Sequence, residues 1–366
     1  MKVHKNHSRI AAPYLTNYIP QLTFPRFLAA SLVVVFHYGS STFPFNTGLI
    51  SKFVAQGSIA VSFFFFLSGL VLTINYFRGP GFTFGSFFRK RIARIYPIYV
   101  FAFLITFFLA MLIKGAYPRG TSIFIQLFSL HAWSPGMCLE INYPGWSISV
   151  EMFFYAVFPV LIFFFRKKNL LFITIFTGLI WLFSILQNYY LAKLIEDPDI
   201  IATGEFILYF PLWHLNTFLF GMLSGILILN YKHKIISKFL PVCLFLAGSV
   251  TFIIILVTDN PFRPYIHNGL LSPVYMMLAV GLALDSSWIA RLMGIRELVY
   301  LGDISYSIYI LQFPVYLLFI WILKIENVNG VYFYAYFTVL LLVSAATYKL
   351  IEQKFRKLLI SVRNKS

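Results

Sequence analysis

The chain has 366 residues, of which 60% are hydrophobic and only 11% are charged, and its mean hydropathy is +0.81. This composition excludes a water-soluble protein, because a soluble domain of this size cannot bury so much apolar side chain, and it predicts an integral membrane protein. The formal charge of +17 could indicate nucleic-acid binding, but in an apolar chain a basic excess is first a sign of membrane topology.

Ten stretches of roughly 17 to 25 mostly apolar residues are long enough to cross a bilayer. We therefore predict an all-α bundle of about ten transmembrane helices. Residues 1–366 are expected to form a single membrane-embedded domain, because no long polar block or flexible linker divides them. The predicted helices span about 22–43, 57–77, 96–114, 147–165, 170–187, 206–230, 239–257, 268–285, 299–323 and 331–349, and residues 350–366 are predicted to form a basic, interfacial cytoplasmic tail.

Basic residues predict the orientation of this bundle. If the N-terminus lies in the cytoplasm, the alternating helices place most of the 29 Lys and Arg residues on the inner side. This bias is what the positive-inside rule expects, so both termini are predicted to be cytoplasmic and nucleic acid is not an expected partner. The outer side then holds Lys52, Lys114, Arg119, Lys193, Arg263 and Lys324.

The first predicted helix carries Arg26 and His37 at the two ends of an apolar stretch. At ~1.5 Å per residue they lie roughly 16 Å apart along the axis, with Arg26 at the cytoplasmic start and His37 in the outer half of the bilayer. Ionisable groups inside a span are costly unless they face the bundle interior, so each is a candidate functional residue. The simpler alternatives are a surface-reaching anchor for Arg26 and a structural buried histidine for His37.

The segment PGWSISVEMFFYAVFP supplies a second group of polar residues. Ser147, Glu151 and Tyr155 recur every four residues and so lie on one stripe of a helix, whose outer end Trp146 marks. Glu151 is then about 7 Å below that end, at a depth similar to that of His37. A contact between them would orient the imidazole and raise its basicity. The alternative is a protonated Glu151 that is hydrogen-bonded within the bundle.

Cations gather in the segment FFRKRIARIYPIY, between the second and third predicted helices. Taken alone, the segment is typical of a cytoplasmic topology anchor. Arg91 and Arg94, at positions i and i+3, also project from one helical face and could bind a polyanionic head group.

Neither a disulfide nor a bound metal is expected. Cys138 and Cys243 fall on opposite sides of the membrane, and no Cys, His and Asp cluster has metal-ligand spacing.

These segments together resemble the acyltransferase-3 family of polytopic membrane proteins, which move acetyl or other short acyl groups onto sugars of the bacterial cell envelope. The spacing from Arg26 to His37 is similar to the family's R-x10-H motif, and GSIAVSFFFFLSGLVLT, which contains Ser68, resembles its second-helix signature. The likeness spans residues 22–358, but Gln312 stands where many members have a histidine. The other matching segments are FFRKRIARIYPIY, GWSISVEMFFYAVFP with the W-S-x-x-x-E pattern, LGDISYSIYILQFP and the terminal YKLIEQKFRKLL.

The resemblance implies a multi-pass O-acyltransferase of the bacterial inner membrane. Acetyl-CoA, or another short acyl-CoA, would be its co-substrate, and no permanently bound cofactor is expected. Arg26, Arg91 and Arg94 would bind the donor, and His37 and Glu151 would be catalytic. Whether His37 acts as a general base or as a transient acyl carrier stays open. Residues with a substrate-binding or structural role would be Trp146, Ser147, Tyr155 and Ser68.

The acceptor is expected to be an envelope glycan, such as a lipopolysaccharide O-antigen, an exopolysaccharide or peptidoglycan. The outer loop around residues 115–145 has aromatic side chains suited to sugar faces, so acceptor choice is expected there. His131 and Glu140 in that loop are as well explained as ordinary loop residues. The esterase-like domain that some family members carry after the last helix is not expected here, and passing the acyl group to such a domain would need another protein.

Two other functions also fit a ten-helix bundle. In a proton-coupled transporter, His37 and Glu151 would relay protons while the arginines recognise an anionic or glycolipid substrate. A non-catalytic flippase or assembly partner for envelope polymers would not need His37 at all. The bilayer is a partner under every one of these hypotheses, and the sequence does not fix the oligomeric state.

Overall fold

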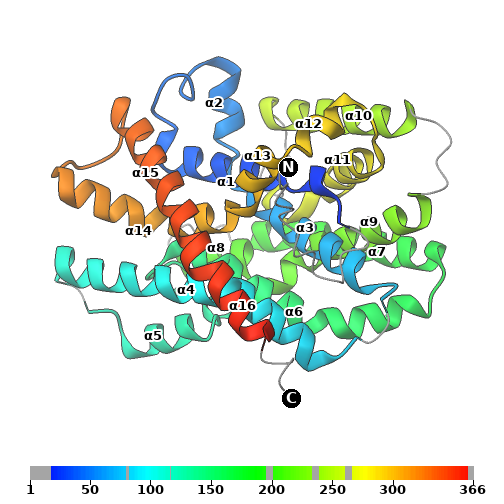
Figure 1. Ribbon diagram of the computed structural model, residues 1–366, viewed down its shortest axis with the longest axis horizontal. Helices are drawn as coiled ribbons and strands as arrows, with labels where there is room; N and C mark the ends of the chain where they lie inside the picture. The colour runs from blue at the N-terminus through cyan, green and yellow to red at the C-terminus, as the bar shows by residue number, and fades with distance from the viewer. Residues whose placement is uncertain are drawn as a thin grey trace, which may run out of the picture.

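The computed structural model describes residues 18–79, 82–115, 117–194, 201–232, 239–259 and 266–361. Within these residues all regular structure is helical, and nine helices are long and apolar enough to cross a membrane. The chain is therefore an all-α polytopic membrane bundle, as its composition predicts (Figure 1). Arg263 and both chain termini lie outside the described residues.

The described helices divide into longer and shorter elements. The long elements are α1 (Phe24–Val34), which continues as the π-helix η2 (Val35–Gly39), α3 (Ile59–Tyr76), α4 (Phe84–Lys114), α6 (Trp146–Arg166), α7 (Leu170–Leu194), α9 (Leu215–Tyr231), α10 (Phe239–Val257), α11 (Ser272–Leu284), α14 (Ser305–Leu323) and α15 (Val331–Thr347). The short helices are α2 (Gly48–Val54), α5 (Gly120–Leu127), α8 (Ile201–Tyr209), α12 (Trp288–Met293), α13 (Arg296–Asp303) and α16 (Gln353–Ser361).

The predicted helix over 268–285 is shorter and irregular at its start. Asn268 and Gly269 have non-helical dihedrals, and α11 begins only at Ser272. Gly269 has φ +96°, and a Cβ there would overlap the side chain of Asn216. Asn216 Nδ2 donates to the Asn268 carbonyl at 3.0 Å, and Asn268 Nδ2 donates to Ile207 O at 2.8 Å. These bonds satisfy the polar groups of the irregular turn, which makes it tolerable inside a bundle.

Other boundaries also differ from the hydropathy pattern. The helix predicted over 206–230 is divided into α8 and α9 by the 3-10 helix Pro211–His214, and the one predicted over 170–187 continues to Leu194. The helix predicted over 96–114 begins at Phe84, so the basic segment is itself helical. The helix predicted over 299–323 is divided at Ile304 into α13 and α14. The last predicted helix, 331–349, continues through the π-helix η8 (Tyr348–Glu352) into α16, and Figure 1 shows this run as one long ribbon that ends near the C-terminus.

Small residues bring α3 and α9 into close contact. A Cβ on Gly69 would collide with the Phe218 carbonyl, and one on Gly221 would collide with the Phe66 carbonyl. Without a hydrophobic driving force in lipid, such close backbone contact is a main source of helix association. This contact fixes the rotation of α3, so that Phe66 and Gly69 face α9 while Phe64 and Ser68 face the opposite side.

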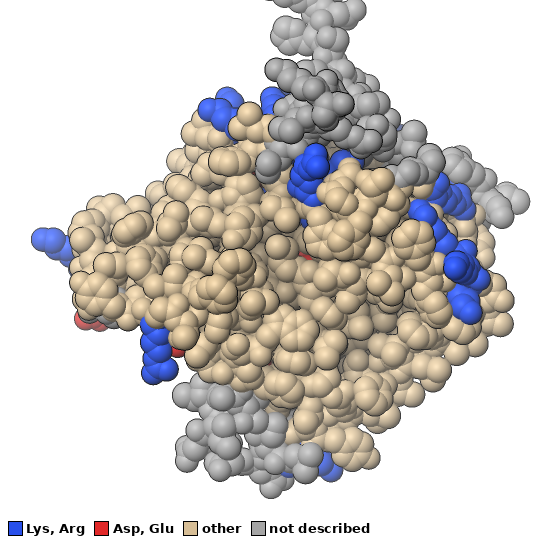
Figure 2. All heavy atoms as spheres, turned by 90° about the horizontal axis from the view of Figure 1, so that it is seen from below, with Lys and Arg blue, Asp and Glu red and all other residues tan. Residues whose placement is uncertain are grey.

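The surface supports a position within a bilayer. Figure 2 shows a broad area of uncharged residues, with Lys and Arg side chains mainly around its margins. In the most apolar windows of α7 and α10 only 17% of the residues are buried inside the protein. Such outward-facing apolar helices are stable in lipid but not in water.

Candidate active site

A cavity lies between α1, α3, α4, α6 and α14, and the space free of atoms in it and in its opening to solvent is about 730 Å³. All the residues that the sequence predicts for the site line this cavity, with the exception of His37 and Trp146. Its polar lining residues are Arg26, Ser68, Arg91, Arg94, Ser147, Glu151, Tyr155, Ser305, Tyr306 and Tyr309, and its apolar ones are Val61, Phe64, Phe65, Leu67, Val71, Leu72, Ile95 and Ile148.

The order of these residues along their helices gives the cavity a charged end and an apolar end. Arg26 lies in the first turn of α1, Arg91 and Arg94 lie in the early part of α4, and Ser305 begins α14. Further along the cavity are Ser68 and Glu151. The far end is formed by Val61 and Phe64 in the first turns of α3, by Ser147 and Ile148 at the start of α6, and by the Tyr309 side chain, whose hydroxyl bonds to Pro144 O beside Ser147.

Arg26, Arg91 and Arg94 form an arginine cluster at the charged end. All three are partly buried, and in the described part of the chain no carboxylate lies within 4.0 Å of any of their nitrogens. The positive charge of Arg26 is repelled by Arg94 and is attracted more weakly by Asp303 and Glu151. Because an arginine side chain stays protonated in proteins, the cluster keeps its positive charge and is suited to a polyanion.

Glu151 is held in the middle of the cavity by two hydroxyl groups. The Tyr155 hydroxyl, one turn further along α6, donates to Glu151 Oε1 at 2.5 Å, and Ser68 Oγ of α3 donates to the same oxygen at 3.3 Å. No hydrogen bond from another described residue reaches its second oxygen. The stripe of residues four apart therefore places Glu151 and Tyr155 together, with Ser147 one turn before them.

His37 lies elsewhere, in the π-helix at the end of α1. Its side chain is exposed, and its ring packs edge-on against Phe36 and Tyr143, with centroids 4.9 Å apart in both cases. Among the described residues, no hydrogen bond or ion pair joins His37 to Glu151. An unbroken α-helix would place His37 within about 20° of Arg26 around the axis. In the structure His37 lies in the π-helix Val35–Gly39 at the other end of this run, where its ring packs on Tyr143 and does not line the cavity.

The turn Tyr143–Gly145 contacts both the cavity and His37. The Pro144 carbonyl accepts hydrogen bonds from the Tyr309 hydroxyl and from Ser147 Oγ, both at 3.0 Å, and both residues line the cavity. The neighbouring Tyr143 packs on His37, and its hydroxyl donates to that of Tyr38 at 2.7 Å. The apolar end of the cavity and His37 are thus joined by this one turn.

Trp146 is a buried core residue. It is only 5% exposed, and its indole packs among the rings of Phe65, Tyr209, His214 and His267. It supports the cavity through Phe65, which lines it. The sequence did not single out Tyr309 or Tyr143, although the i+3 and i+4 spacing of Tyr309 from Tyr306 and Ser305 could have indicated a shared face.

Gln312 and the two loop residues of interest lie outside the cavity. Gln312 is fully buried, and its Nε2 donates to Tyr309 O at 2.8 Å, so it supports a lining residue. His131 is fully buried and parallel to the Tyr99 ring, and burial lowers the pKa of its imidazole from 6.5 to about 4. Glu140 is exposed.

Comparisons with known proteins agree on one chemistry. A family model described as an acyltransferase domain matches residues 19–349. The chain is similar to acyltransferase MdmB of Streptomyces mycarofaciens, with 34% identity over 152 residues, which are 39% of this chain and 38% of the relative. It is also similar to O-acetyltransferase OatA of Staphylococcus aureus, with 22% identity over an alignment of 382 positions that covers 96% of this chain and 60% of the relative.

A putative O-acetyltransferase of Staphylococcus aureus, SACOL0978, is 23% identical over 376 residues, 93% of this chain and 58% of the relative. The chain thus spans no more than 60% of the length of these curated relatives. No solved structure matches it.

Proposed function

Because the chain belongs to the acyltransferase-3 family, we propose that it is an inner-membrane enzyme that transfers an acyl group, most simply acetyl, from cytoplasmic acyl-CoA to a hydroxyl of an envelope glycan. One observation carries the proposal beyond the family's general activity. The arginine cluster has no ion-pair partner in the described part of the chain, although charges inside a membrane normally pair. A ligand with several phosphates would supply the missing counter-charge.

The donor site extends from this cluster. The phosphates of CoA match guanidinium groups, which can bind them through two parallel hydrogen bonds. The pantetheine arm would then lie along α3, from the level of Leu72 to that of Val61, a rise of roughly 16 Å. Glu151 faces this path, so we assign it to balance the arginine charge.

The acyl transfer would take place where the thioester meets His37. In the direct route, His37 takes the proton of the sugar hydroxyl as its oxygen attacks the thioester carbonyl. The C–S bond then breaks, and the CoA thiolate takes the proton from the imidazolium. In the covalent route, the imidazole attacks the thioester carbonyl, the C–S bond breaks, and the CoA thiolate leaves with the imidazole N–H proton. The sugar hydroxyl then attacks the acyl-imidazole, the C–N bond breaks, and the hydroxyl proton returns to the imidazole. Both routes require the Tyr143–Gly145 turn to let the thioester reach His37.

The acylation of envelope glycans in the native host tests this proposal. We compare cells that carry the wild-type protein, His37→Ala or no copy, and we measure alkali-labile acyl groups on the glycans by mass spectrometry, with membrane levels checked by blot. The acyl groups on the glycans should appear only in cells that carry the wild-type protein. His37→Ala should lower the rate of acyl transfer by about 10²- to 10⁴-fold. Identical glycans in all three strains, with both proteins present in the membrane, would contradict it.

A proton-coupled transporter is the second candidate, and one observation favours it. The segment Ile266–Leu270, just before α11, contains the non-helical residues Asn268 and Gly269, and irregular backbone at a helix end inside the bundle is typical of substrate sites in transporters. A transporter would show counterflow of an anionic or glycolipid substrate in proteoliposomes and no acyl-CoA turnover, whereas the acyltransferase would show the reverse.

A further inference from the structure

We propose that Phe64 sets the upper length of the acyl group that the cavity accepts, and that this group is uncharged. The inference rests on the proposed function, because it places the donor phosphates at the arginine cluster and the acyl group at the apolar end of the cavity. Beyond the proposed function, the inference identifies Phe64 as the side chain that selects among acyl donors.

Among the described residues that line the apolar end, none is a cation that could neutralise a charged acyl chain. Val61, Phe64, Phe65 and Ile148 line it, and the hydroxyls of Ser147 and Tyr309 are already bonded to the Pro144 carbonyl. The cations that line the cavity are the three arginines, which lie at the other end beyond Glu151. A succinyl carboxylate would therefore be buried without a cation, and it would be repelled by Glu151.

Of the two phenylalanines at this end, Phe65 is fixed and Phe64 borders the free space. Phe65 is 2% exposed and packs against the rings of Trp146, Phe154 and His214 with centroids 5.0 to 5.7 Å apart. Phe64 is partly exposed, and its described ring contact is with Tyr309 at 5.8 Å. The ring of Phe64 thus forms the wall that a longer acyl chain would meet first.

The preceding residue offers a matched control. Phe63 is on the same helix, but its ring packs against Phe66 and Tyr275 at 6.3 and 5.4 Å, on the side away from the cavity. Phe63→Ala removes the same number of atoms as Phe64→Ala without enlarging the acyl site. Loss of packing alone therefore affects both variants, whereas a change in acyl-length preference affects only Phe64→Ala.

The test measures kcat/KM for acetyl-, propionyl-, butyryl-, hexanoyl- and succinyl-CoA, with acceptor-bearing membranes and mass spectrometry of the glycan. One excluded methylene typically costs about 10- to 200-fold in enzyme discrimination. We expect Phe64→Ala to raise the ratio of butyryl to acetyl transfer by about tenfold or more, and Phe63→Ala to leave it within about twofold. Phe64→Trp should lower the ratio of propionyl to acetyl transfer, and succinyl-CoA should be a poor donor for every variant.

The outcomes separate this inference from the proposed function. Wild-type transfer of acetyl with an unchanged length profile in both Phe64→Ala and Phe64→Trp would overturn the role of Phe64. Succinyl transfer as fast as acetyl transfer would overturn the requirement for an uncharged group. Absence of turnover with every donor, by folded wild-type protein in membranes that carry acceptor, would overturn the proposed function itself.

Discussion

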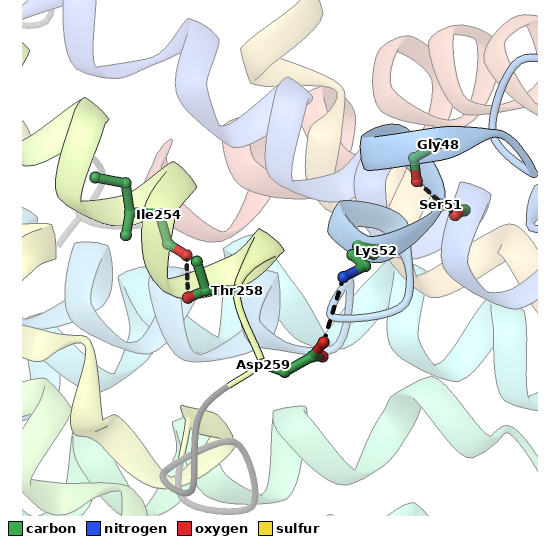
Figure 3. A network of polar contacts seen from close by, with 6 residues as sticks. All are labelled: Gly48, Ser51, Lys52, Ile254, Thr258 and Asp259. Atoms are coloured by element: carbon green, nitrogen blue, oxygen red, sulfur yellow. Dashed lines mark hydrogen bonds and ion pairs between the residues drawn. The ribbon is translucent and has the colours of Figure 1, made fainter.

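Two charged regions of this protein differ in how their charges are satisfied. Figure 3 shows Lys52 of α2 and Asp259, just after α10, with their charged atoms 3.3 Å apart. Both side chains are well exposed, at 48% and 76%. The arginine cluster lies inside the bundle, and no carboxylate of the described residues comes within 4.0 Å of it.

This difference indicates that the exposed pair is a surface ion pair and that the arginine cluster is a binding site for an anionic ligand. The exposed pair is already solvated, so pairing adds at most about 1 kcal/mol. The arginines have lost part of their hydration and cannot lose their charge, so their cost is recovered only when an anion binds. His131 is fully buried and needs neither an ion-pair partner nor a bound anion, because an imidazole can become neutral by releasing its proton.

Acidification gives the largest expected effect on stability, through His131. Its folded pKa of about 4 lies below the ordinary histidine pKa of 6.5, so the unfolded state binds more protons between these values. Stability therefore falls as the pH drops from 6.5 to 4, by as much as about 3 kcal/mol from this residue. Denaturant unfolding of the wild type and His131→Gln at about pH 7 and pH 4.5 should show a smaller acid loss in the variant. An equal loss would mean that His131 is not a buried neutral imidazole.

Glu151→Gln should sharpen the contrast between the two regions. Glutamine can keep hydrogen bonds with Ser68 and Tyr155 but removes the negative charge that attracts Arg26. The cluster then has less internal compensation, so CoA should bind about 2- to 10-fold more tightly, which corresponds to roughly 1 kcal/mol at an effective dielectric constant near 20. Weaker CoA binding by a folded variant would contradict the balancing role that we assign to Glu151.

Lys52→Gln gives the smallest expected effect. Loss of the exposed pair with Asp259 should change the free energy of unfolding by less than about 1 kcal/mol and leave CoA affinity within about twofold. Thermal unfolding and CoA titration check both numbers. A large loss of CoA affinity would break the distinction between a structural surface pair and a ligand-binding cluster.

Most of the fold could be predicted from hydropathy because its long spans are uniformly apolar. The start of α11 could not, since the left-handed Gly269 depends on its contact with Asn216. The early turns of α4 were missed because their arginines lower the local hydropathy, although Arg91 and Arg94 face a cavity rather than lipid.

Part of the candidate site could also be predicted, because spacing along one helix fixes which residues share a face. Glu151 and Tyr155 are four residues apart, and the structure joins them by a hydrogen bond. Depth in the bilayer suggested a contact between His37 and Glu151, but the structure places the ring of His37 against Tyr143 instead. That contact depends on how the Tyr143–Gly145 turn packs on a distant part of the chain, which spacing along one helix does not indicate.

The most direct test of a donor site at the arginine cluster is equilibrium binding of CoA to the protein in lipid nanodiscs. We compare the wild type with Arg94→Gln and with Arg78→Gln, an exposed arginine outside the cavity whose side chain bonds to Asn230 at 2.7 Å. Charge-assisted hydrogen bonds contribute roughly 1.5 to 3 kcal/mol each, so Arg94→Gln should raise the Kd by about 10- to 150-fold while Arg78→Gln leaves it unchanged. Equal affinity of all three proteins would contradict a donor site at the cluster.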